Sequence, residues 1–174
     1  MQTVRVWDPL VRLFHWSLVI GFAANALIVP EDSRLHIWIG YGIVGLVAMR
    51  VLWGFFGRGY ARFDSFPPSL SSALAQVREI AGGPTTQHRG HTPLGAWMIY
   101  NLIVTLALIG MTGHMMTMDA FWGLEWPEAL HEAVVSWAEI SVVAHIVAVI
   151  VESRRTRTNL PLAMVTGYKT LPTE

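Results

Sequence analysis

The sequence predicts an all-α integral membrane protein, a four-helix bundle formed by one domain over residues 1–174. Hydrophobic residues make up 53% of the chain and charged residues only 14%, whereas soluble domains carry about 25% charged residues. Four apolar segments approach or exceed the length of about 20 residues that a helix needs to cross a bilayer. They are residues 10–29, 35–56, 94–116 and 133–151.

Two connections between these segments differ in length. Residues 30–34 form a short turn, whereas residues 57–93 form a long loop. Five apolar residues of this loop would share one face of a helix over residues 69–80, and Gly82-Gly83-Pro84 would end it. They are Leu70, Ala73, Leu74, Val77 and Ile80. We expect a short amphipathic helix on the membrane surface.

Basic residues predict the orientation of the bundle. They gather in the N-terminal segment, the long loop and the C-terminal tail, whereas the other two connections contain only Arg34. The gathered residues are Arg5, Arg12, Arg58, Arg62, Arg78, Arg89, Arg154, Arg155, Arg157 and Lys169. Because cytoplasmic connections carry an excess of Arg and Lys, both termini and the long loop are expected in the cytoplasm.

The first apolar segment has a second interpretation, as a signal peptide. Ala24-Asn25-Ala26 resembles a cleavage site of small residues that follows a basic start. His15 and Asn25 interrupt the apolar region, and cleavage would leave only three spans, so we favour a transmembrane helix.

The chain contains no cysteine. Disulfides, thiolate metal sites, Cys-ligated iron–sulfur clusters and covalently attached haem are therefore excluded. Any cofactor has to be held by other side chains.

Two histidines begin and end an apolar stretch of the fourth segment, at His131 and His145. On a helix that advances about 100° and 1.5 Å per residue, they share one face at positions roughly 21 Å apart. Histidines inside a membrane are costly unless they find a partner, so each is a functional candidate.

Two other histidines match these by depth. The second and fourth segments both enter from the outer side, so His36 lies level with His131. The first segment runs outward and places His15 level with His145. Two imidazole pairs at two depths are the arrangement that would hold two haem groups, each iron bound by two histidines. Such iron has no open position, which favours electron transfer over oxygen binding.

Neighbouring residues fit two such sites. Arg50 follows His36 at the same spacing at which His145 follows His131. It would therefore reach the inner haem and bind a propionate. The alternative is that Arg50 extends to the cytoplasmic interface. Ala138 would lie between the two sites on the histidine face, and Gly40 would allow close approach of a cofactor or close helix packing.

The remaining histidines are weaker candidates. His114 ends the third segment level with His131 and is the rival for the outer ligand position. We expect His88 and His91 in a solvated loop, where two ligands make only a weak case for a divalent metal site.

Glu139 is a carboxylate inside the fourth segment. It is a candidate for proton transfer or for a hydrogen bond to a quinone. The alternative is a neutral glutamic acid between helices, hydrogen-bonded to Asn25 or Ser141.

The sequence resembles the bacterial cytochrome b561 family, together with the b-type cytochrome subunits of membrane nickel–iron hydrogenases. The resemblance is carried by the stretches "VWDPLVRLFHWSL", "RLHIWIGYGIVGLVAMRVLWGFFG", "GYARFDSF" and "ESRRTRTNLPLAMVTGYK", and by the two histidines of the fourth segment. It implies a dihaem b-type cytochrome of the bacterial inner membrane, an electron-transfer oxidoreductase working between a periplasmic-side redox partner and the quinone pool. Its two haem b groups would be bound by His15, His36, His131 and His145.

Several alternatives and partners follow from this interpretation. In one alternative, the outer haem would oxidise superoxide and pass electrons to quinone. In another, the chain would anchor a hydrogenase-like complex, and the third alternative is a haem-free scaffold.

We expect contact with membrane lipid, quinone and a redox protein, and no nucleic acid; a homodimer stays open. An acidic outer connection favours a basic c-type cytochrome. Its residues are Asp119, Glu125, Glu128 and Glu132.

Overall fold

A computed structural model describes residues 2–83, 86–88 and 90–171 of the chain. Four helices in these residues are long and apolar enough to cross a membrane. They are α1 (Pro9–Leu27), α2 (Arg34–Phe56), α4 (Pro93–Met115) and α5 (Trp126–Thr156). The predicted all-α membrane bundle is therefore confirmed.

Polar caps fix where three of these helices begin. The Asp8 side chain accepts a hydrogen bond from the amide of Val11 at 2.8 Å and so caps α1. Ser33 caps α2 and Thr92 caps α4 in the same way. Each cap satisfies an amide that would otherwise lack a partner in the first turn.

Helix α5 extends beyond the predicted span 133–151 at both ends. It begins at Trp126 with Pro127 in its first turn, a position that tolerates proline. It continues through polar residues until Arg157, whose left-handed backbone (φ 52°) ends it. Hydropathy alone marks the apolar core of a helix and misses polar turns of this kind.

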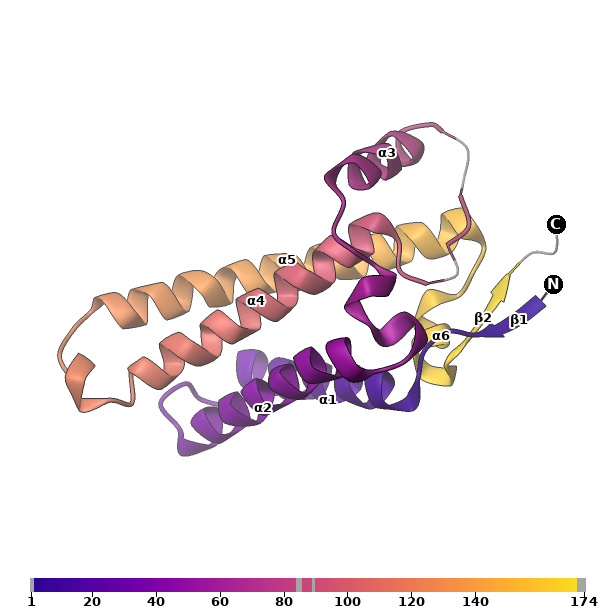
Figure 1. The fold of residues 1–174 in the computed structure, drawn as a ribbon. Coiled ribbons are helices and arrows are strands. Elements are labelled where there is room, and N and C mark those ends of the chain that lie inside the picture. The colour runs from indigo at the N-terminus through magenta and orange to yellow at the C-terminus, as the bar shows by residue number, and fades with distance from the viewer. Residues whose placement is uncertain (1, 84–85, 89, 172–174) are drawn as a thin grey trace.

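The bundle consists of two helix pairs (Figure 1). Helices α1 and α2 form one pair, and α4 and α5 form the other, with α2 packed against α4. Ile43 and Val47 from α2 are buried with Leu106 from α4 in the central core. Both chain ends and the connection from α2 to α4 lie at one end of the bundle, and the other two connections lie at the opposite end.

A two-stranded sheet joins the two ends of the chain, which the sequence analysis did not predict. Strand β1 (Gln2–Arg5) pairs antiparallel with β2 (Tyr168–Leu171) after the short helix α6 (Leu160–Thr166). The carbonyl of Gly167 accepts hydrogen bonds from the amides of Val6 and Trp7 at 2.9 and 3.1 Å.

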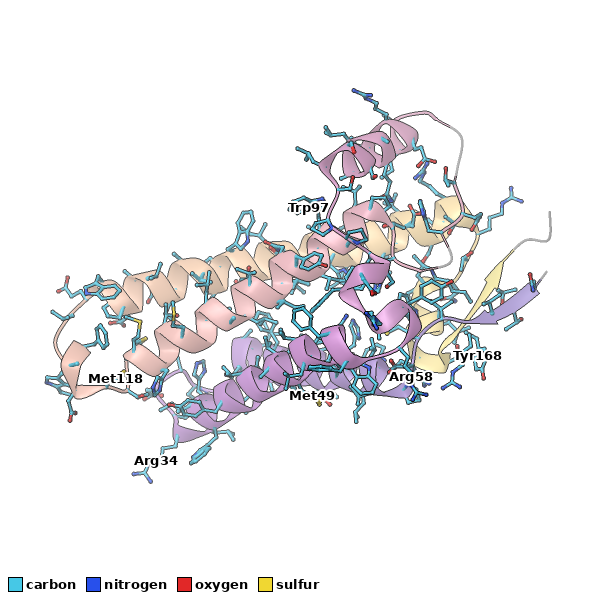
Figure 2. The ribbon with its side chains drawn as sticks, in the orientation of Figure 1. Arg34, Met49, Arg58, Trp97, Met118 and Tyr168 are labelled. Atoms are coloured by element: carbon cyan, nitrogen blue, oxygen red, sulfur yellow. The ribbon has the colours of Figure 1, made fainter. Side chains whose placement is uncertain are left out.

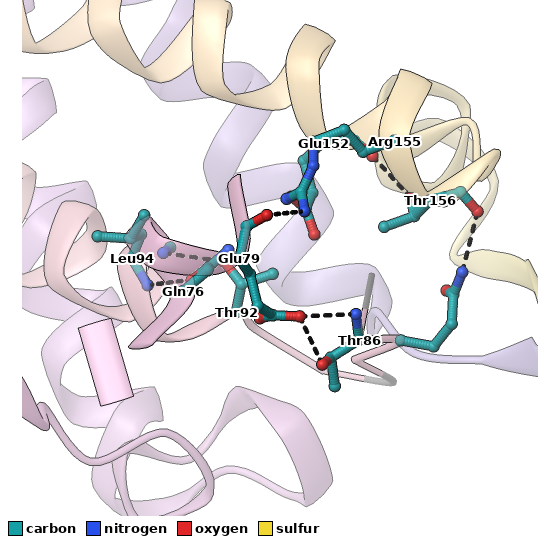
Figure 3. A network of polar contacts seen from close by, with 10 residues as sticks. Gln76, Glu79, Thr86, Thr92, Leu94, Glu152, Arg155 and Thr156 are labelled. Atoms are coloured by element: carbon teal, nitrogen blue, oxygen red, sulfur yellow. Dashed lines mark hydrogen bonds and ion pairs between the residues drawn. The ribbon is translucent and has the colours of Figure 1, made fainter. Parts of the chain in front are cut away.

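The short helix expected in the long connection is α3 (Leu70–Ile80). Its Gln76 is buried and accepts a hydrogen bond from the amide of Leu94 at 2.8 Å, and Arg155 of α5 donates to the carbonyl of Glu79 at 3.0 Å (Figure 3). These contacts hold α3 beside α4 and α5. Of the five apolar side chains expected on its membrane-facing side, Ala73 is buried and the other four are exposed, as expected for a helix on a membrane surface. They are Leu70, Leu74, Val77 and Ile80.

Candidate functional site

The structure brings His15 of α1 and His145 of α5 together. Both side chains are half-buried, and the two imidazoles lie close enough to interact electrostatically. Nδ1 of His15 is buried without a hydrogen-bonding partner. We refer to these two residues as the inner pair.

The second pair, the outer pair, consists of His36 of α2 and His131 of α5. These imidazoles also interact electrostatically, and Nδ1 of His36 is buried without a partner. The backbone of His36 is fixed on both sides, since its amide donates to Ser33 Oγ at 3.1 Å and its carbonyl accepts from Asn25 Nδ2 at 3.1 Å. Helix α5 therefore contributes one histidine to each pair.

Thr112 of α4 orients the imidazole of His131. Its hydroxyl oxygen lies 2.8 Å from the carbonyl oxygen of Leu108 and 2.9 Å from Nδ1 of His131. A hydroxyl at this distance from a carbonyl donates its single proton to it, so it accepts the Nδ1 proton of His131. Nε2 of His131 is then unprotonated and free to bind a metal ion.

The sequence analysis missed Thr112. The residue is fully buried at 0% exposure, yet one threonine in an apolar helix reads as ordinary packing. The sequence offered one signal, which is the adjacent glycine, Gly113. In the structure, a Cβ atom at this position would lie 3.2 Å from the His131 ring.

Space around the histidine pairs is uneven. A Cβ atom added at Gly40, one turn after His36, would meet nothing within 4 Å, so this glycine leaves open space. Ala138 is different, because protein atoms already cover it to 1% exposure. The small side chain of Ala138 therefore serves helix packing and does not leave room for a cofactor.

Arg50 is buried near the cytoplasmic end predicted for α2. Its side chain is 3% exposed, its guanidinium lies 5.1 Å from the centre of the Phe63 ring, and its Nη1 has no hydrogen-bonding partner. The guanidinium therefore does not reach solvent. A buried guanidinium with an unused donor requires an anion.

These residues fit an iron porphyrin with carboxylate substituents. Ring nitrogens without partners belong to His15 and His36, and an unpaired cationic donor belongs to Arg50. Across the described part of the chain, no three His, Asp or Glu side chains gather in a way that would hold a bare metal ion. Paired imidazoles instead suit a metal whose remaining positions are filled by a macrocycle.

His114 does not join the outer pair in this structure. The side chain is exposed, and its Nδ1 lies 2.9 Å from the hydroxyl of Tyr41. His114, the alternative to His131 as the outer ligand, is therefore hydrogen-bonded to Tyr41 of α2.

The prediction that His91 lies in a solvated loop is wrong. Its ring lies 4.6 Å from that of Trp7 and 4.3 Å from that of Phe66, measured between centroids. Its Nδ1 is buried without a partner. Local composition suggested solvent exposure, whereas the covering rings come from residues distant in sequence.

Glu139 has neither of its expected partners. Its side chain is exposed on α5, Asn25 donates to the His36 carbonyl, and Ser141 accepts from Asn101 at 2.9 Å. The alternative in which Glu139 is hydrogen-bonded to Asn25 or Ser141 is therefore wrong.

A comparison with known protein families gives one match. Residues 6–167 match the family model described as prokaryotic cytochrome b561. No curated protein and no solved structure matches the chain. The matched range includes both histidine pairs and Arg50.

Proposed function

Since this chain belongs to the prokaryotic cytochrome b561 family and is thus a membrane b-type cytochrome of electron transfer, we propose that it binds two haems. In this proposal, electrons pass between a periplasmic-side redox partner and the quinone pool. Each haem iron, when bound, exchanges one electron at a time.

The observation that carries this proposal is the sharing of α5 between two histidine pairs. His145 and His131, fourteen residues apart on α5, each interact electrostatically with a histidine of another helix. Each pair would hold one haem iron through its two imidazoles, which would favour electron transfer over oxygen binding. Electrons entering at one pair would leave at the other.

The chain's own residues would orient the two groups. Thr112 would keep Nε2 of His131 available at the outer site, and Arg50 would balance the charge of a carboxylate at the inner site. Helix packing between α2 and α4 would exclude water from the space between the pairs, since its core is apolar.

The proposed orientation places both termini in the cytoplasm of a bacterium, with the bundle in the inner membrane. Figure 2 shows Arg58 and Tyr168 at the end of the bundle that holds the termini, and Arg34 and Met118 toward the other end. The basic long connection and tail lie at the same end. This distribution supports a cytoplasmic position for that end.

The opposite end offers a surface for a redox partner. Four acidic residues are exposed there: Asp119 and Glu125 in the longer connection, and Glu128 and Glu132 in the first turns of α5. A basic c-type cytochrome would be steered to such a surface by charge complementarity. Lipid would cover exposed apolar side chains such as Ile20 and Ile140.

Haem counting tests the proposal. We expect two b-type haems per chain from pyridine haemochrome spectra of the detergent-purified protein, one in His145→Ala, and two in the matched control His114→Ala. A colourless wild-type protein, or two haems retained in His145→Ala, would contradict the proposal.

A further inference from the structure

Arg50, which the proposed function assigns to the inner site, belongs to a larger cluster of buried and half-buried side chains whose other members have no role yet. It consists of Arg50, Phe63, Phe66, His91 and Tyr100, and we call it the Arg50–His91 cluster. Arg50 lies over Phe63, and His91 lies against Phe66. The centroids of these two phenylalanine rings are 5.8 Å apart, and both rings also contact Tyr100. The two nitrogen-bearing side chains therefore belong to one continuous aromatic environment.

Two hydrogen-bonding atoms in this cluster lack partners, Nη1 of Arg50 and Nδ1 of His91. Burial, together with the positive charges of Arg50 and Lys169, lowers the pKa of His91 to about 3. The imidazole is therefore neutral near pH 7, and in the tautomer that carries the proton on Nδ1 its one N–H group would be a donor in the cluster. Buried donors without acceptors are rare in folded proteins, so a missing acceptor is indicated.

The charged groups around the cluster do not supply that acceptor. Asp8 interacts electrostatically with Arg50, but its two oxygens accept hydrogen bonds from the amide of Val11 and from Nε1 of Trp53. Lys169 adds a positive charge, and its Nζ donates to the carbonyls of His88 and Gly90. The cluster thus has an excess of positive charge and of donors.

We propose that Arg50 and His91 together bind one carboxylate, a propionate group of the haem held by His15 and His145. This inference rests on the proposed function, because it requires a haem at the inner pair. A guanidinium and a neutral imidazole would both donate to the same carboxylate, and the aromatic rings would keep water away from it.

A propionate suits the cluster better than an anion from solution. Arg50 is only 3% exposed, so a dissolved anion would have to lose its hydration to reach it. A carboxylate attached to a cofactor within the bundle reaches the same place from inside. One carboxylate would neutralise Arg50, and the neutral His91 would add a donor without adding charge.

The test uses the haem-loaded protein and compares His91→Phe, His91→Asn, Arg50→Gln and the double variant His91→Phe/Arg50→Gln. Phenylalanine keeps the packing between Trp7 and Phe66 but removes the donor, whereas asparagine retains a donor near the position of Nδ1. His88→Phe is the matched control from the same loop. Redox titration gives the midpoint potential of each haem, and redox-difference infrared spectra with carboxyl-labelled haem follow the propionate band.

We expect His91→Phe to lower the equilibrium constant for reduction of the inner haem about tenfold. This change corresponds to a midpoint potential lower by about 59 mV for one electron. His91→Asn should recover at least half of this shift, and His88→Phe should show none. The double variant should shift the potential by less than the sum of the single variants, because both residues bind one group. The propionate band should move in His91→Phe and Arg50→Gln.

Other results would overturn the inference. An unchanged inner potential and propionate band in His91→Phe would remove His91 from the site, and additive shifts would mean that the two residues act separately. Altered affinity for a quinone analogue with unchanged potentials would assign the cluster to quinone. If His91→Phe loses the inner haem, His91→Asn carries the same comparison. A wild-type protein without haem would instead refute the proposed function.

Discussion

Thr112 decides, at the scale of a single residue, which nitrogen of His131 is available. Its hydroxyl is held by the carbonyl of Leu108 and accepts from the imidazole. Metal-binding histidines need such partners, and losing one typically costs about 10–100-fold in affinity. The threonine would therefore be a positioning residue for the proposed outer site.

Thr112→Val should weaken haem retention at the outer site by about tenfold or more, because valine has the same shape but cannot accept the Nδ1 proton. Thr112→Ser keeps the hydroxyl and is the matched control. Haem loss at increasing dilution, together with the electron paramagnetic resonance signal of the oxidised outer haem, measures the effect. Equal retention and identical signals in both variants would contradict the positioning role.

Residues whose proposed role follows from their own position could be predicted from the sequence. The four histidines were paired by depth because a helix has a fixed rise per residue. Thr112 and His91 escaped it because their roles depend on neighbours that only the folded chain supplies. His91 is covered by Trp7 and Phe66, and the sequence around His91 does not indicate those contacts.

At the scale of elements, two glycines of α2 have different surroundings. A side chain at Gly54 would overlap the ring of Phe63, whereas one at Gly42 would meet nothing within 4 Å. The first glycine lets Phe63 approach the helix and lie beside Arg50. The second has no such contact and serves as an internal comparison.

Gly54→Ala should destabilise the protein by about 1–3 kcal/mol, the usual cost of overpacking. Gly42→Ala should be neutral or slightly stabilising, because alanine favours a helix more than glycine does. Thermal unfolding in one detergent compares the two variants. If Gly54→Ala melts like Gly42→Ala, the contact with Phe63 does not constrain α2.

The long helices were predictable because each carries an extended apolar run of membrane-spanning length. The strands β1 and β2 were not, because they are four residues each, contain polar side chains and pair across nearly the whole chain. Helix α6 has only seven residues, too few for a periodic signal. Pairing between distant short segments leaves no local pattern in the sequence.

At the scale of the whole molecule, Lys169 connects the terminal sheet to the loop before α4. Its side chain is 4% exposed and donates to the carbonyls of His88 and Gly90. It also lies 5.5 Å from the centre of a Trp7 ring. One side chain thereby joins the N-terminal segment, the loop and the C-terminal strand.

We call the pairing of β1 with β2 and the contacts of Lys169 with the loop the closure of the terminal sheet. The stability of this closure should depend on pH, because burial lowers the pKa of Lys169 to about 8. When the strands open, the pKa returns to about 10.4, so the open form binds more protons between these values. The closed form should gain stability as pH rises from about 8 to about 10.4, by about 1.4 kcal/mol per pH unit. It should lose that gain as pH falls from about 10.4 to about 8, and its stability should change little below 8 because both forms are then protonated.

Hydrogen exchange of the Val6 and Trp7 amides measures this closure, after correction for the intrinsic exchange rate. Protection should increase over that pH range in the wild-type protein and stay constant in Lys169→Met. The same rise in both proteins would show that Lys169 does not control closure.

The pairing of β1 with β2 also determines an order of events during synthesis. Gln2–Arg5 is made before all four membrane helices, and Tyr168–Leu171 only after them. The first strand is therefore unpaired while the helices are made. The contacts of Trp7 and Lys169 with the loop before α4 are completed together only when translation reaches the second strand.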